Sequence, residues 1–441
     1  MSVQINSKTP HNYSHRDVLN LATPMILSSL SIPLLGVVDT AVMGHLDSAH
    51  YLAAVAVGAV LFNFIYMGMN FLRMGTTGLI AQAYGKNQHS EVRSVFMQAI
   101  MVAIALATTL LLIQKPLSLT LHWLQASPIV TETAIKYFQW RIWSAPAVLA
   151  NFVLIGWFLG MQSGRGPMLM LFTTNFINII LDIVFVTQLG MDVDGVALAS
   201  VIAEFCGLGA GLVYWRVLLQ RHPGSWNRQE IFDFSKLKRF FTVNSHILVR
   251  TLSLMTAFAF FTAQGARFGD SILAANAVLI NFQAILAYGL DGFAHAAEAL
   301  VGRATGEKNK SGLQKAMRIA FQWAAGIAVG FTLVFLLFGK GIINLLTDIE
   351  QIRELAKEYL FWLIISPIVS VWCFVYDGIF IGATKTKEMM LNMLASTFLV
   401  FIPIALVLIN FGNHGLWAAF MLFLIARAVF LHKDRNKLFE F

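Results

Sequence analysis

The sequence predicts an all-α integral membrane protein, with twelve transmembrane helices in two six-helix lobes related by a pseudo-twofold axis along the membrane normal. Three observations lead to this prediction. Apolar stretches long enough to cross a bilayer recur along the chain, the two halves resemble each other at a fixed offset, and basic residues fall on alternate loops. Together they describe a duplicated membrane protein.

The apolar stretches set the number of spans. Hydrophobic residues make up 57% of the chain and charged residues 12%, compared with roughly 25% charged residues in soluble proteins. A helix needs about 20 apolar residues to cross the hydrocarbon core. The expected lobes are residues 1–220 and 238–441, joined by a cytoplasmic linker at 221–237. The predicted spans are residues 18–46, 52–84, 92–114, 132–161, 167–189, 195–218, 239–266, 272–303, 313–339, 353–383, 388–411 and 414–432.

An internal repeat with an offset of 221 residues supports two equivalent halves. Chance matches between apolar segments would not all occur at the same offset. Duplicated halves are common in transporters. The pairs that match include Ala83 and Ala304, Gly85 and Gly306, Ser90 and Ser311, and Pro146 and Pro367.

The distribution of basic residues explains the formal charge of +8. The termini and the turns after even-numbered spans hold most of them, and Arg427 counts among these in this interpretation. This asymmetry predicts that both termini are cytoplasmic, and an even number of spans per half then makes the halves parallel repeats. It indicates orientation in a membrane and not a nucleic-acid partner. The opposite loops hold only Lys115, Lys136, Arg267, Lys340, Arg353 and Lys357.

The amino terminus and the cysteines give little information about the function. The first seventeen residues are polar and Val18–Leu46 is too long for a signal-peptide core, so no cleavable signal peptide is expected. Cys206 and Cys373 fall inside predicted spans, where they behave as small apolar side chains.

Ionisable residues inside spans are costly in hydrocarbon, so they are the first candidates for function. Asp39 and Asp182 each lie about seven residues before the outer end of their spans, roughly 10 Å along a helix, which predicts one shared cavity. Asn178 precedes Asp182 by four residues and therefore shares its helix face. Structural polar contacts are the alternative for both carboxyls.

The second half has its own charged candidates. Arg250 and Asp291 lie near the midplane on adjacent spans, so an ion pair is expected, with either a structural or a functional role. Asp377 and Glu298 lie nearer the cytoplasmic face, where a solvated position and a structural or gating role are expected.

Aromatic, methionine and proline residues give weaker signals. Prolines kink helices and can supply hinges, and Pro33 precedes Asp39 in the first span. Six aromatic or methionine side chains are candidates to line a pocket for flat apolar cations, with contact to lipid as the alternative. These candidates are Phe152, Trp157, Met161, Met255, Phe258 and Phe261.

Three segments resemble the multidrug and toxic compound extrusion (MATE) family, specifically its DinF-like branch, and the resemblance covers nearly the whole chain. They are Pro33–His45, which contains Asp39, Thr76–Gly85 and Asp377–Thr384. The resemblance implies twelve helices in two lobes, and export of organic cations or amphipathic toxins in exchange for protons or sodium. It also implies that Asp39 is the coupling residue, surrounded by Asn178 and Asp182. Arg250 stands in the region where another bacterial branch has a glutamate, which weakens the case for a sodium site there.

The expected mechanism follows from burial. Burial disfavours the charged form of a carboxyl, so protonation of Asp39 from outside would release a cationic substrate and allow the carrier to return by alternating access. The alternatives are a sodium-coupled exporter and a lipid-linked saccharide flippase. The flippase would need a cationic groove, for which Arg73 and Arg250 are the main candidates. An enzyme is not expected, because His295 and Glu298 have only H-x-x-E spacing and the chain has no G-x-S-x-G motif.

The expected partners are small amphipathic or cationic substrates and the lipid bilayer, with no nucleic acid. No cofactor or bound metal is expected beyond the coupling ion. The protein is expected to be a monomer in the cell (inner) membrane.

Overall fold

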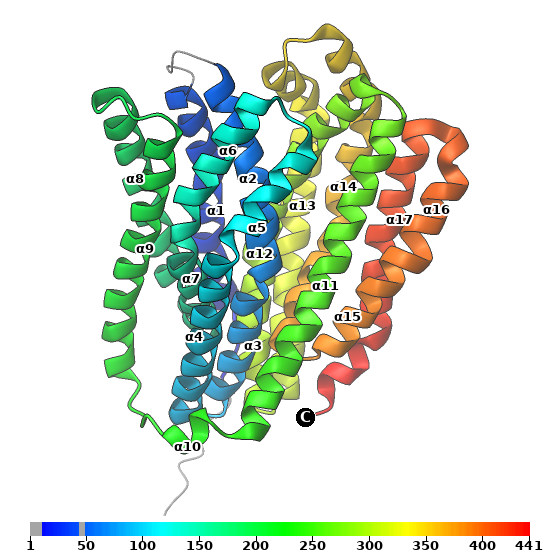
Figure 1. The fold of residues 1–441 in the computed structure, drawn as a ribbon. Coiled ribbons are helices and arrows are strands. Elements are labelled where there is room, and N and C mark those ends of the chain that lie inside the picture. Colours follow the sequence, from blue (N-terminus) through cyan, green and yellow to red (C-terminus); the bar gives the residue numbers. More distant parts are fainter. Residues whose placement is uncertain (1–10, 44–48) are drawn as a thin grey trace, which may run out of the picture. The chain divides into compact units, whose positions relative to one another are not determined.

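The computed structural model describes residues 11–43 and 49–441, with no side chains described for residues 30–49. Every regular element in this part of the chain is a helix. The α-helices of Figure 1 are α1 (His15–Met43), α2 (Ala49–Met69), α3 (Phe71–Gly85), α4 (His89–Leu112), α5 (Gln114–Leu119), α6 (Pro128–Arg141), α7 (Ala145–Gly160), α8 (Arg165–Asp182), α9 (Val193–Arg221), α10 (Arg228–Ile231), α11 (Phe234–Arg267), α12 (Asp270–Gly306), α13 (Lys310–Leu346), α14 (Glu350–Gly382), α15 (Thr386–Leu394), α16 (Ile402–Val407) and α17 (Gly412–Lys433).

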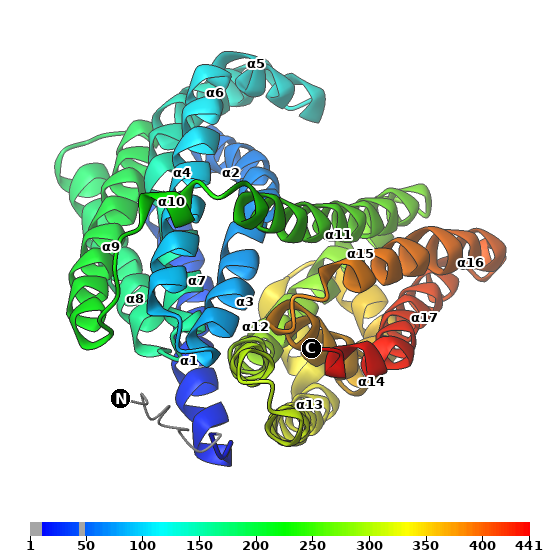
Figure 2. The same cartoon turned by 90° about the horizontal axis from the view of Figure 1, so that it is seen from below.

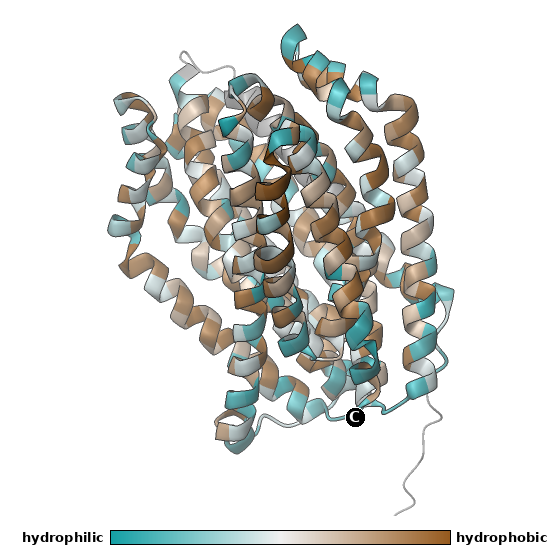
Figure 3. Ribbon diagram, turned by 90° about the vertical axis from the view of Figure 1, so that its right-hand side faces the viewer, coloured by the Kyte–Doolittle hydropathy of each residue, from teal (hydrophilic) through white to brown (hydrophobic). Residues whose placement is uncertain are grey.

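The helices account for all twelve predicted spans. Ten stretches of the described residues are long and apolar enough to cross a membrane. Nine of them correspond to one predicted span each, and the tenth, Thr386–Phe439, contains the last two. Helix α1 supplies the remaining first span. Figure 3 shows hydrophobic residues along the lengths of the helices, with hydrophilic residues gathered at many of their ends and in the connecting turns.

Several predicted spans are interrupted helices. The predicted span 52–84 divides at Asn70 into α2 and α3. A short 3₁₀ turn, Ile142–Ser144, separates α6 from α7, and Pro146 lies in the first turn of α7, where a missing N–H group costs nothing. Pro367, the repeat partner of Pro146, lies inside the continuous helix α14. The two equivalent prolines therefore have different local structures, and only Pro146 marks a break.

The helices form two compact units. The α8–α9 unit comprises Thr23–Thr77 and His89–Phe260, and the α12–α14 unit comprises Met1–Ala22, Gly78–Gln88 and Phe261–Phe441. In the first, α8 and α9 lie side by side, as do α4 and α7; in the second, α14 packs against α12, α13 and α17 (Figures 1 and 2). The predicted lobes follow the sequence repeat and not contacts, so their boundaries stay a prediction.

Inside the α12–α14 unit, α3 and α12 meet through repeat-equivalent residues. A Cβ atom at Gly85 would collide with the carbonyl oxygen of Arg303, and one at Gly306 with the carbonyl oxygen of Gln82. The repeat offset of 221 residues separates Gly85 from Gly306, and it also separates Gln82 from Arg303. Such reciprocal contacts are what a twofold axis produces. Glycine at both positions lets the two backbones approach closely.

The connection between α9 and α11 packs against the start of α4, within the α8–α9 unit. Arg93 Nη2 donates to the carbonyl oxygen of His222 at 3.2 Å, and its guanidinium lies 5.3 Å from the ring centre of Trp226. Gln98 Nε2 donates to the carbonyl oxygen of Ile231 at 2.9 Å. Burial lowers the pKa of His222, and the neighbouring His89 and Arg221 add to this shift, so its imidazole is neutral near pH 7.

The basic-residue asymmetry predicts which loops face the cytoplasm. In a variant without Cys206 and Cys373, a cysteine at Gln229 should react with maleimide only after cells are permeabilised. A cysteine at Asp348, or at residues 47–50, should react in intact cells. The positions 229 and 348 are exposed, so a failure to react reports the side of the membrane and not burial. Labelling of position 229 in intact cells would contradict the topology.

Candidate functional site

A buried polar cluster lies between α8 and α9. Asp182 is the last residue of α8 and is 0% exposed. Asn178 Nδ2 donates to Asp182 Oδ2 at 3.0 Å and lies 3.4 Å from Ser200 Oγ of α9. The one-turn spacing of Asn178 and Asp182 thus places an amide beside a carboxylate, as the sequence predicts. A π-helical segment, Ile183–Gln188, follows Asp182 at once, and such irregular turns often occur at functional sites.

A second carboxylate, Glu204, lies one helical turn after Ser200 on α9. Asn151 Nδ2 of α7 donates to Glu204 Oε2 at 2.9 Å and to its backbone oxygen at 3.2 Å. Arg141, the last residue of α6, contributes a positive charge to the surroundings of Glu204. The polar cluster therefore continues along α9 from Ser200 to Glu204.

Glu204 and Arg141 are not among the site residues predicted from the sequence. Glu204 falls inside the predicted span 195–218 and Arg141 inside 132–161. Their ionisable side chains within apolar spans are the sequence signal that marks both. Their mutual proximity, however, depends on how α6, α7 and α9 pack.

Asp39 lies on α1, four residues before its last residue Met43, and its side chain is outside the described part of the structure. The predicted cavity shared by Asp39 and Asp182 therefore stays a prediction. Arg250 of α11 is buried, and it belongs to the α8–α9 unit, whereas Asp291 belongs to the α12–α14 unit. Their expected ion pair also stays a prediction. Arg73 is buried, with its Nε atom 3.2 Å from Asn70 Oδ1.

The α12–α14 unit contains a buried ion pair that corrects two expectations. Arg427 Nη2 of α17 lies 2.6 Å from Asp377 Oδ2 of α14, and the two side chains are only 5% and 10% exposed. Arg427 is therefore not a loop residue, because α17 continues to Lys433 and its face at Arg427 is covered. Asp377 and Glu298 are also buried, at 7% and 1%, and not solvated as expected.

Other groups complete the surroundings of this pair. Asp291 and Cys373 contribute to the electrostatic environment of Arg427. The Arg427 guanidinium also lies 5.5 Å from the ring centre of Phe423. Apolar side chains line the small void beside the pair, namely Met389, Met393 and Leu431.

The six predicted substrate-lining residues are mostly packed against other aromatic rings or buried. Trp157 is 1% exposed and lies 5.4 Å from Phe158 between ring centres. Phe261 is 1% exposed and lies 4.9 Å from Trp417. Met161 and Met255 are buried, and Phe152 and Phe258 are partly exposed. A role of these residues in lining a substrate pocket stays a prediction.

These features define a class of protein. Membrane-spanning helices that bury carboxylates and arginines mark pathways for ions or small substrates. In the part of the chain that is described, no group of three or more His, Cys, Asp or Glu side chains is placed to hold a metal ion. The fold and the buried charges are those of a polytopic membrane transporter.

Comparisons with known proteins identify the family. The MatE family model matches residues 24–184 and again residues 247–407, once in each predicted half. The chain is 42% identical over 419 residues to the DNA damage-inducible protein F of Escherichia coli (strain K12). This alignment covers 95% of this chain and 91% of the relative. It is 24% identical over 449 residues to the multidrug resistance protein NorM of Aliivibrio fischeri, over 96% and 94% of the two chains.

Solved structures agree on the fold. A crystal structure of MATE in the straight conformation has a TM-score of 0.87 to this chain, with 20% sequence identity and 96% of each chain covered. An outward-facing MATE transporter of the MOP superfamily has a TM-score of 0.86, with 19% identity and the same coverage. The chain belongs to the MATE family. It is therefore a multi-pass membrane transporter and not an enzyme.

Proposed function

We propose that this chain exports organic cations and other amphipathic compounds in exchange for protons, from the inner membrane of a cell, with both termini in the cytoplasm. The observation that carries the proposal is the fully buried carboxyl of Asp182 with its polar partners on α8 and α9. The similarity to NorM, a multidrug resistance protein, supports the substrate class. We propose that the monomer is the working unit.

The surroundings of Asp182 suit an exchange site. Its carboxyl is buried inside the helix bundle and accepts a hydrogen bond from Asn178. Carboxyls inside membrane-spanning helices commonly form proton pathways in pumps and transporters. We infer that a cationic substrate that binds near Asp39 and Asp182 displaces a proton from these carboxyls.

The position of Asp377 argues against a cation-coupling site at this residue. Hard cations are bound by clusters of oxygen ligands. The Asp377 carboxylate already faces the guanidinium of Arg427 at 2.6 Å, so its charge is compensated inside the protein. This ion pair weakens the case for a sodium ion at Asp377. The proposed coupling residue is therefore Asp39 in the α8–α9 unit, with Asn178 and Asp182 adjusting its surroundings.

A flux measurement in proteoliposomes tests the proposal. Adding an organic cation such as ethidium on one side should move protons in the opposite direction, reported by a pH-sensitive dye. An imposed pH gradient should drive ethidium against its concentration gradient, and a sodium gradient of equal size should not. Liposomes without protein are the control. Ethidium movement driven by sodium alone, with no change in pH, would establish the sodium-coupled alternative instead.

A further inference from the structure

A large pocket opens between α13, α14 and α17. Its volume is about 880 Å³, near the upper end of the roughly 300–1,000 Å³ of small-molecule sites. All of its lining residues belong to the α12–α14 unit. Four apolar side chains in it are 42–48% exposed, namely Ile368, Trp372, Ile425 and Val429. In a membrane protein, exposed apolar surface of this kind faces acyl chains.

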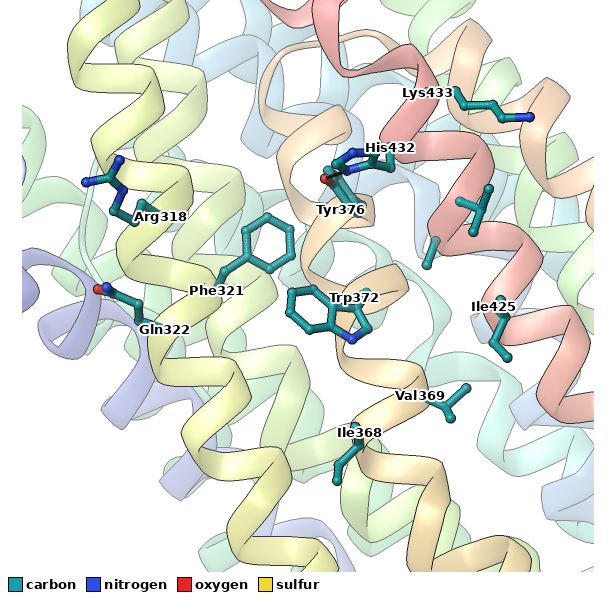
Figure 4. A pocket seen from close by; sticks show the side chains of 12 residues that line it. Arg318, Phe321, Gln322, Ile368, Val369, Trp372, Tyr376, Ile425, His432 and Lys433 are labelled. Atoms are coloured by element: carbon teal, nitrogen blue, oxygen red, sulfur yellow. Dashed lines mark hydrogen bonds between the residues drawn. The ribbon is translucent and has the colours of Figure 1, made fainter.

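One end of the pocket is basic. Figure 4 shows Lys433 and His432 at one end and Ile368 at the other, with Arg318 on the facing helix. Arg318 and Lys433 are exposed, and neither forms an ion pair within the described part of the chain. Lys433 is the last residue of α17, and Arg318 lies in the third turn of α13, so both are near one membrane face. The basic-residue pattern predicts that this face is cytoplasmic.

A hydrogen-bond chain adds a neutral donor between these cations. Arg435 Nη1 lies 3.0 Å from His432 Nε2, and His432 Nδ1 lies 2.6 Å from the hydroxyl oxygen of Tyr376. Arginine can only donate, so Nε2 must accept, and the proton of a neutral imidazole is then on Nδ1. His432 consequently donates to Tyr376. The hydroxyl hydrogen of Tyr376 is left to donate to a ligand in the pocket.

We infer that this pocket binds an anionic phospholipid of the cytoplasmic leaflet. Its phosphate would accept from Arg318, Lys433 and the hydroxyl of Tyr376, and one acyl chain would run along Trp372 towards Ile368. Two cations without counter-charges at the end of an apolar trough match a lipid that has a negative head and a long apolar tail. A cationic substrate would be repelled from the same end.

Quenching of tryptophan fluorescence by brominated lipids locates the bound lipid. In detergent micelles, phosphatidylglycerol with dibrominated acyl chains should quench the protein more strongly than dibrominated phosphatidylcholine. The extra quenching should disappear in Trp372→Phe, which removes one of the ten tryptophans and keeps an aromatic ring. In the variant Arg318→Ala/Lys433→Ala, the preference for phosphatidylglycerol should fall roughly twenty-five-fold, since each of the two cations near a lipid surface contributes about fivefold.

A matched variant distinguishes lipid binding in this pocket from general electrostatic attraction between the basic protein and anionic lipid. Lys310→Ala/Lys387→Ala removes two exposed basic residues of the same unit that do not line the pocket, and it should keep the preference. Equal thermal stability in phosphatidylcholine shows that each variant is folded. Equal quenching by the two lipids, or an unchanged preference in Arg318→Ala/Lys433→Ala or in Trp372→Phe, would overturn the inference. Displacement of the lipid by millimolar glycerol 3-phosphate would assign the pocket to a soluble phosphate instead.

Discussion

Asp39→Asn should abolish gradient-driven efflux while the protein remains folded. Asparagine keeps the shape and hydrogen-bonding capacity of aspartate but cannot gain or lose a charge, so a structural aspartate tolerates the change and a proton carrier does not. We expect at least a tenfold loss of efflux of a fluorescent cation, measured in vesicles that contain equal amounts of each variant and carry an imposed pH gradient.

The polar cluster on α8 and α9 should give graded effects in the same assay. Asp182→Asn, Glu204→Gln and Asn178→Ala should each reduce efflux less than Asp39→Asn, because these residues adjust the charge balance around the coupling site. Carboxyls that interact titrate as coupled groups, so each of these substitutions should also shift the pH dependence of efflux. Asp270→Asn, at an exposed position in the first turn of α12, is the matched control and should transport normally.

The result for Asp39→Asn shows whether Asp39 or another carboxyl is the coupling residue. Wild-type efflux by Asp39→Asn would remove its coupling role and leave Asp182 and Glu204 as candidates in the α8–α9 unit. Loss of efflux in Asp270→Asn as well would mean that the assay reports general damage and not coupling.

Breaking the Arg427–Asp377 pair should produce the largest loss of stability. Arg427→Met keeps the apolar stem but leaves the Asp377 carboxylate without its cation, and Asp377→Asn leaves the guanidinium without its anion. Removing one partner of a buried pair costs about 3–5 kcal/mol, whereas replacing both is often much milder. Each single variant should therefore melt well below the wild type in detergent, and the double variant should recover part of the loss.

The double-mutant cycle has an internal control in the same unit. Arg353 Nη2 lies 2.8 Å from Asp348 Oδ1, but Asp348 is fully exposed, so Asp348→Asn should change the melting temperature little. Additive effects at positions 377 and 427 would contradict the coupling of these two residues. The same cycle with Arg250→Ala and Asp291→Ala tests the pair that the sequence predicts.

The sequence alone determines the membrane-spanning architecture, because burial in lipid requires long apolar helices and each helix carries that requirement in its own composition. The internal repeat can also be read from the sequence without knowledge of the tertiary structure. It predicts the equivalence of Gly85 and Gly306, which the structure places in one reciprocal contact. The pairing of Asn178 with Asp182 follows from helical spacing on one element, so it too was predictable.

Contacts between helices were not predictable in this way. Arg427 near the end of a span has the same local sequence whether it reaches water or a buried carboxylate, and only the packing of α17 on α14 brings it to Asp377. Glu204 likewise acquires its partner Asn151 from a different helix. The basic end of the lipid pocket joins Arg318 and Lys433, which are far apart in the chain. Charges separated by many residues attract only when tertiary packing brings them within a few ångströms, because electrostatic attraction depends on distance in space and not in sequence.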